Sequence, residues 1–144
     1  MPMSFQVAID CRDPHALADW WAETLGWQVE PQDEGFIRSM LAQGHATEAD
    51  TTTHRGALVW RTGAAVVRPG ADPGPGGRLY LQQVPEPKAV KNRVHLDLRP
   101  GPGEEPPTVG SLVARGATVV GEGRQGPHTW TVLQDPEGNE FCVS

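Results

Sequence analysis

The chain carries the same short pattern twice: an alternating strand, a helix, a glycine that ends the helix, and a second strand. In the first copy the strand contains Gln6 and the helix ends at Gly26, whereas in the second the strand contains His95 and the helix ends at Gly116. The two residues of each pair are 20 and 21 positions apart. Neither copy is large enough to bury its hydrophobic face alone. The repeat therefore predicts two half-sheets that pack together, with a ligand cleft between them.

Each half is predicted to contain a strand, a helix and three further strands. Asp13 can cap the first helix and Pro14 suits its first turn. An insertion at 33–55, absent from the second half, contains a predicted helix over 33–44. We expect a single domain over 1–144, with module one at 4–87 and module two at 92–144. The predicted strands are 5–10, 27–30, 57–60, 64–67 and 78–84 in module one, and 93–98, 117–120, 129–134 and 139–143 in module two, where 108–115 is the helix and 135–139 a tight turn.

Composition excludes several classes of function. The 144 residues carry a formal net charge of −6, which does not suit binding to nucleic-acid phosphates. No apolar run approaches the ~20 residues that span a bilayer, and the N-terminus lacks the features of a signal peptide. A cytoplasmic location is expected, with Cys11 and Cys142 as free thiols. The glycines at 74–77 precede a strand and not a helix, so a phosphate-binding loop is not predicted.

Three motifs, in their order and spacing, resemble those of a known superfamily. They are Leu25-Gly26-Trp27 after the first helix, residues 91–98 around His95, and residues 135–141 before the last strand. The chain resembles the vicinal oxygen chelate superfamily, also called the glyoxalase/bleomycin resistance/dioxygenase fold, and in particular the glyoxalase-like proteins of actinobacteria. This resemblance implies an α+β fold of two βαβββ modules that form a curved mixed sheet around a single cleft. It also implies a homodimer.

Side-chain alternation along the strands predicts which residues line the cleft. On the strand 93–98, Val94 and the leucines are expected to face the core, and the residues between them to face the cleft. On the last strand, Phe141 and Val143 are assigned to the core. The polar side chains predicted to face the cleft are Gln6, Gln82, His95, Asp97, Glu140 and Cys142.

The superfamily takes one metal ligand from the first and one from the last strand of each half. The resemblance assigns these positions to Gln6, Gln82, His95 and Cys142, with Glu140 as an alternative to Cys142. Two amides, one imidazole and one thiol are a poor set for a hard divalent ion. Cys142 must ionise to bind, which favours a soft metal if any. We expect a metal-free polar floor and no cofactor, with a divalent metal as the alternative.

His95 is also a candidate general base, because Asp97 lies two residues along on the same face. The alternative is that His95 has a structural role and is hydrogen-bonded to a neighbouring strand. Arg93 and Arg99 could hold an anionic group of a ligand or pair with neighbouring carboxylates, and pairing is favoured.

Aromatic residues offer candidate walls for the cleft. Trp60 and Trp130 lie on predicted strands, where either could stack on a planar ligand or pack in the core. Trp20, Trp21 and Trp27 are expected in the core of the first half. The histidines His15, His45 and His54 are expected on the surface.

The favoured function is metal-free binding of a small, partly aromatic organic molecule. The alternative is a lyase, isomerase or dioxygenase of the vicinal oxygen chelate type, in which His95 acts as metal ligand or base. A third hypothesis is an interaction module whose 33–55 insertion contacts a protein partner. No nucleic-acid or membrane partner is expected.

Overall fold

The computed structural model describes residues 1–70 and 76–144, which form two compact units, Met1–Pro87 and Lys88–Ser144. Residues 71–75, part of a predicted Pro/Gly-rich connection that includes Gly74, lie outside the described residues. No helix in the described ranges is long and apolar enough to cross a membrane.

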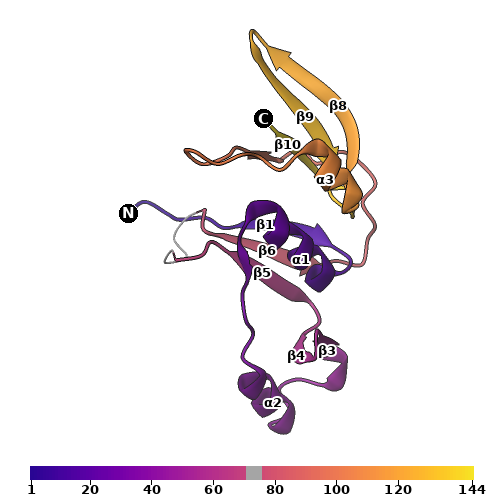
Figure 1. Ribbon diagram of the computed structural model, residues 1–144. Coiled ribbons are helices and arrows are strands. Elements are labelled where there is room, and N and C mark those ends of the chain that lie inside the picture. Colours follow the sequence, from indigo (N-terminus) through magenta and orange to yellow (C-terminus); the bar gives the residue numbers. More distant parts are fainter. Residues whose placement is uncertain (71–75) are drawn as a thin grey trace. The chain divides into compact units, whose positions relative to one another are not determined.

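The first unit is built on a four-stranded mixed sheet with the strand order β1-β6-β5-β2. The strands β1 and β6 run parallel, and the other neighbours run antiparallel. The helix α1 lies against β5 and β6 (Figure 1). The elements are β1 (Val7–Cys11), α1 (Pro14–Leu25), β2 (Gln28–Val29), β5 (Gly63–Val67) and β6 (Arg78–Gln83).

The predicted limits of α1 are confirmed. The Asp13 carboxylate accepts a hydrogen bond from the Ala16 backbone N–H at 3.2 Å, and Pro14 takes the first helical position. Gly26 ends the helix with φ +66°, a left-handed conformation that glycine adopts without steric cost. The helix buries Trp21, which is 1% exposed, in the core of the unit.

The segment between β2 and β5 forms a separate layer of structure. It contains the predicted helix α2 (Glu34–Ala42), a 3-10 turn η1 (Glu48–Asp50), and a hairpin of β3 (Thr51–His54) and β4 (Ala57–Trp60). These elements extend beyond the four-stranded sheet (Figure 1). The expectation that 57–60 completes that sheet is wrong, because within the described part of the chain β4 pairs with β3 alone. The threonine-rich β3 lacks the apolar alternation that would have predicted it.

Two histidines attach this hairpin to α1, contrary to their expected surface location. His15 is buried, and its Nε2 lies 2.7 Å from the Trp60 carbonyl oxygen. His54 Nε2 lies 2.8 Å from Asp19 Oδ2, which also accepts from Arg55 at 3.0 Å. The backbone carbonyl of a strand residue therefore explains why a histidine is buried in a helix.

The second unit repeats the topology of the first. Its sheet has the order β7-β10-β9-β8. As in the first unit, the strands that come first and last in the sequence, here β7 and β10, run parallel. The β8–β9 hairpin is longer than the other two strands (Figure 1). The α+β class with two βαβββ modules is thus confirmed, whereas the single cleft stays a prediction. The elements are β7 (Leu96–Leu98), α3 (Val109–Ala114), β8 (Thr118–Gln125), β9 (His128–Gln134) and β10 (Glu140–Val143).

The core of the second unit follows the predicted alternation on β10 but not at the start of β7. Phe141, Leu133 and Leu112 are fully buried. Val94, expected in the core, is 81% exposed, because pairing with β10 begins only at Leu96.

An ion pair joins β6 to the end of β2 in the first unit. Arg78 donates to both carboxylate oxygens of Glu30, at 2.8 and 2.9 Å, and a further guanidinium nitrogen donates to Gln6 Oε1 at 2.6 Å. The hydrogen bonds from Arg78 hold the pKa of Glu30 below its ordinary value of 4.5, against a smaller opposing effect of burial. Because the pKa of Glu30 is lower in the folded state, its carboxylate stabilises the fold at pH values above its ordinary pKa. That contribution is lost as the pH falls through the lowered pKa.

The variant Glu30→Gln should lower the free energy of unfolding at pH 7 by up to about 1 kcal/mol, the range of a partly exposed ion pair. The difference from the parent chain should shrink as the pH falls through the lowered pKa of Glu30, because the parent's carboxylate then becomes protonated. Urea denaturation at pH 7 and at a series of acidic pH values measures the difference. Glu86→Gln is the control, because Glu86 is exposed and has no ion-pair partner among the described residues. A difference that stays constant with pH would contradict this assignment.

Candidate functional site

One face of the second sheet forms a pocket of about 350 Å³. Its floor comes from β7 and β10 and its wall from β9 and the end of β8. All of its residues belong to the second unit. They are Lys91, His95, Asp97, Arg99, Gln125, His128, Trp130, Val132, Glu140, Cys142 and Ser144.

Strand register places the central residues of this face in two adjacent rows. Asp97 pairs with Cys142, which pairs with Val132 on the next strand. Two residues before Val132 on β9, Trp130 pairs with Gly123 of β8. The aromatic wall therefore lies one row away from the polar floor.

Trp130 lies directly against the backbone of β8. A Cβ atom added at Gly123 would come within 2.1 Å of the indole ring, so only glycine leaves room for the ring there. The His128 ring lies beside the indole, with centroids 5.6 Å apart at an interplanar angle of 38°. The two rings, tilted relative to each other, form an aromatic wall that lines the pocket.

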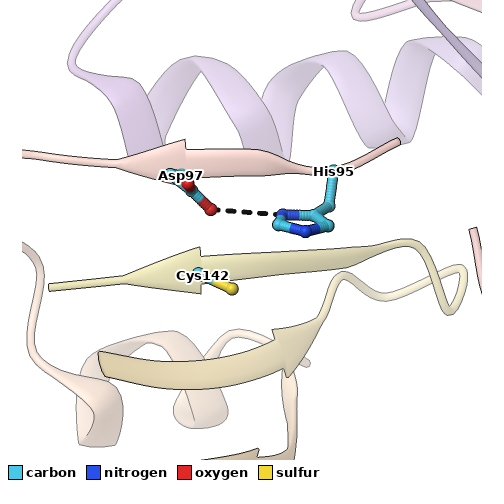
Figure 2. A group of neighbouring side chains, drawn as sticks. All are labelled: His95, Asp97 and Cys142. Carbon is cyan, nitrogen blue, oxygen red and sulfur yellow. Dashed lines mark hydrogen bonds and ion pairs between the residues drawn. The ribbon is translucent and has the colours of Figure 1, made fainter. Parts of the chain in front are cut away.

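The polar floor brings three different functional groups together (Figure 2). His95 Nδ1 lies 3.1 Å from Asp97 Oδ1. One donor atom from each of His95, Asp97 and Cys142 lies within 4.8 Å of the others. Burial raises the pKa of the Cys142 thiol, and Asp97 raises it further by its charge and by a hydrogen bond, against an opposing effect of Lys91. Cys142 is therefore a protonated thiol at neutral pH.

Glu140 faces the same pocket but is held by other groups. Its two carboxylate oxygens accept from Lys88 Nζ at 2.9 Å and from the Asn92 backbone N–H at 3.0 Å. Burial alone would raise the pKa of Glu140, but these hydrogen bonds outweigh it and keep the pKa below its ordinary value. Glu140 thus fixes the segment that leads into β7.

The donor set decides which metal ions the floor suits. Hard ions such as Mg²⁺ and Mn²⁺ take mainly oxygen ligands, and this floor offers one carboxylate, an imidazole and a thiol. The second carboxylate, Glu140, has both oxygens engaged. The floor does not fit a hard ion, whereas its nitrogen, oxygen and sulfur donors fit a softer one such as Zn²⁺.

The candidates of the first unit are not brought together with one another. Gln6 accepts from Arg78, whereas the exposed Gln82 pairs with Asp10, four residues further along β1. At ~3.3 Å per residue, this is a separation of roughly 13 Å along the strand. Trp60 lies in the β3–β4 hairpin, where its backbone N–H donates to Gln32 Oε1 at 2.8 Å. That these residues share a cleft with His95 stays a prediction.

The remaining aromatic and basic candidates have mixed outcomes. Trp20 and Trp21 are buried as expected, but Trp27 is only half-buried and lies under the Arg68 guanidinium, 5.3 Å from its ring centroid. Arg99 lines the pocket, and no ion pair is formed by Arg93 or Arg99 with any described residue.

Sequence reasoning missed several pocket residues. His128 starts β9 one position earlier than the predicted strand, and it shares a face with Trp130 by simple alternation. That signal was available. Lys91 precedes the strand, and Gln125 lies beyond the predicted end of β8, so alternation gave no information on either.

Gly123→Ala should displace the indole of Trp130, because the new methyl group would overlap the ring. Overpacking of this kind typically costs about 1–3 kcal/mol, which urea denaturation measures. Gly121→Ala is the matched control on the same face of β8, since a Cβ there has no heavy atom within 4 Å. If the two substitutions destabilised the protein equally, the assigned contact between the Trp130 indole and Gly123 would be wrong.

Comparison with solved structures identifies the same fold in other bacterial proteins. A hypothetical protein from S. aureus has a TM-score of 0.57 at 12% identity, over 99% of this chain and 96% of that one. A glyoxalase family protein from Bacillus cereus has a TM-score of 0.54 at 16% identity, over 99% and 92%. The bleomycin-binding protein of Streptomyces verticillus, complexed with copper(II)-bleomycin, has a TM-score of 0.50 at 14% identity, over 100% and 96%. At these identities the likeness concerns the fold.

The search of curated proteins gave no match. The family model described as glyoxalase-like domain matches residues 6–144, nearly the whole chain. The protein therefore belongs to the glyoxalase-like domain family, and it shares the fold of solved glyoxalase and bleomycin-binding proteins.

Proposed function

We propose that the protein binds a small organic molecule with a planar, partly aromatic portion in the pocket of its second unit. The observation that carries this proposal is the position of Trp130, held against Gly123 with His128 beside it. A planar group stacked on this wall needs no metal. The bleomycin-binding protein from Streptomyces verticillus was solved in complex with copper(II)-bleomycin, which supports a binding role for this fold.

Polar groups of the pocket would orient such a ligand. Asp97 is already hydrogen-bonded to His95, and Glu140 is held by Lys88. Arg99, by contrast, has no ion-pair partner among the described residues, so it is available to a polar or anionic group of the ligand. A small number of polar groups beside an aromatic wall is typical of small-molecule sites.

A second candidate is an enzyme of the vicinal oxygen chelate type. The specific observation in its favour is the contact between His95 Nδ1 and Asp97. A carboxylate on Nδ1 holds the ring in the orientation that leaves Nε2 able to take a proton from a ligand.

Two further expectations remain proposals of the same kind. The family resemblance supports a homodimer, which sedimentation analysis of the purified chain would test. The composition supports a cytoplasmic location, which fractionation of cells that produce the protein would test.

Trp130→Ala should weaken ligand binding at least tenfold, because it removes the stacking wall. The ligand is first identified by screening small aromatic compounds for quenching of tryptophan fluorescence, and its affinity is then measured by calorimetry. Trp130→Phe should retain affinity within a few-fold, and treatment with EDTA should leave it unchanged. If Trp60→Ala abolishes binding and Trp130→Ala does not, the ligand lies elsewhere.

The enzyme hypothesis gives a different result at His95. If His95 acts as a base, His95→Ala should abolish turnover of the identified ligand and leave its affinity within a few-fold of the parent value. Product formation and calorimetry on the same preparation measure the two quantities. Equal losses of turnover and affinity would exclude the role of a base.

A further inference from the structure

The row of residues that contains Trp130 also carries a cationic side chain and a hydroxyl. Ser144 follows β10, and its backbone N–H donates to the Leu98 carbonyl at 3.3 Å, so the pairing of β10 with β7 continues one residue beyond the strands. This register places Ser144 beside Arg99, and the antiparallel register with β9 places it beside Trp130. Since these three residues all line the pocket, a guanidinium, a hydroxyl and an indole lie in one row on the same face of the sheet.

Arg99 is a charged group of the pocket that the described part of the chain leaves without an ion-pair partner. The carboxylates of the pocket are engaged elsewhere. Asp97 is hydrogen-bonded to His95 (Figure 2), and Glu140 accepts from Lys88. Because Arg99 is exposed, its guanidinium can meet a negative charge that comes from a ligand.

We propose that the ligand of this pocket is an aromatic carboxylate, whose ring stacks on Trp130 and whose carboxylate pairs with the Arg99 guanidinium. This inference rests on the proposed function and names the chemical class of the ligand. A guanidinium presents a planar fork of N–H donors that matches the two oxygens of a carboxylate. Ser144 lies between the two side chains, and its hydroxyl can donate to the same carboxylate.

The spacing of the strands fits a ligand of this kind. Neighbouring strands are roughly 4.8 Å apart, so the backbones of Arg99 and Trp130 are separated by roughly 10 Å across β10. The indole lies over Gly123 of β8, on the side away from β7, and the pocket extends over Ser144 between them. A carboxylate carried on the ring, directly or through a short linker, therefore lies within reach of the long Arg99 side chain.

Lys91 adds a second positive charge to the pocket but is the weaker candidate for this contact. Its Nζ donates to the Asn92 carbonyl at 3.1 Å. Its charge lowers the pKa of Cys142, which indicates that it lies towards the neighbouring row of the floor. An ammonium group is also a point charge without the planar fork. We therefore expect Lys91 to strengthen the binding of any anion and Arg99 to select the carboxylate.

The experiment compares aromatic carboxylates with their primary amides, which have nearly the same shape and no charge. Matched pairs built on benzene, naphthalene and indole rings are titrated into the full chain by calorimetry. Each carboxylate that binds should have at least tenfold higher affinity than its amide, because the amide cannot form charge-assisted hydrogen bonds with Arg99. Higher ionic strength should weaken the binding of the carboxylates and leave that of the amides unchanged.

Variants assign the preference to Arg99. Arg99→Gln should remove it, so that each carboxylate binds within a few-fold of its amide, whereas Arg99→Lys keeps the charge without the fork and should retain part of it. Arg124→Gln is the matched control and should retain the full preference. Arg124 pairs with Thr129 on the opposite face of the same sheet, donates to the Gly126 carbonyl and does not line the pocket. Circular dichroism confirms that each variant is folded before titration.

The outcomes separate this inference from the proposed function. Equal affinities for carboxylate and amide, both lost in Trp130→Ala, would overturn the inference and leave the proposed function intact. A preference that survives in Arg99→Gln, or that is lost in Arg124→Gln, would also overturn the assignment to Arg99. If no pair binds at millimolar concentration, the inference and the proposed function are both wrong.

Discussion

The parallel pairing of β7 with β10 is the constraint on which the candidate site depends. It sets Asp97 opposite Cys142 and brings His95 to the same face, although the two strands are far apart in the sequence. β7 has only three residues, so the pairing needs support at its entrance. Glu140 supplies that support, because its carboxylate holds Lys88 and the Asn92 backbone at the start of the segment. A buried carboxylate thus fixes the strand that carries the functional groups.

In each half of the chain, an aromatic ring lies directly against a glycine of a neighbouring strand. In the first sheet the Tyr80 ring lies against Gly63, as Trp130 lies against Gly123 in the second. Arg78 lies over the Tyr80 ring, 5.6 Å from its centroid, and is itself held by Glu30. The aromatic residue of the first half is therefore covered by an ion pair, whereas that of the second half lines a pocket. The two contacts are not at equivalent positions, because Tyr80 lies on the last strand of its module and Trp130 on the strand before the last.

The sequence predicted what depends on local chemistry. Caps and glycines located α1, α2 and α3, and alternation placed Asp97, Glu140 and Cys142 on one face of the second half. Long-range contacts were not predictable in this way. The burial of His15 depends on a carbonyl of the β3–β4 hairpin, and the position of Trp130 depends on a glycine across the strand. The role of Glu140 likewise depends on a lysine 52 positions earlier. Cross-strand register decides these contacts, and no local pattern encodes it.

The geometry of the pocket defines the chemistry of the ligand proposed for it. The row of Asp97 and Cys142 lies two residues along the strands from the row of Trp130, a separation of roughly 7 Å. A molecule that stacks on the indole therefore reaches the floor with a substituent only a few atoms from its ring. Asp97 is hydrogen-bonded to His95 and Cys142, so that substituent meets Arg99 or Lys91. An anionic oxygen close to an aromatic ring satisfies this arrangement, because the ring stacks on the indole while the oxygen pairs with a cationic side chain.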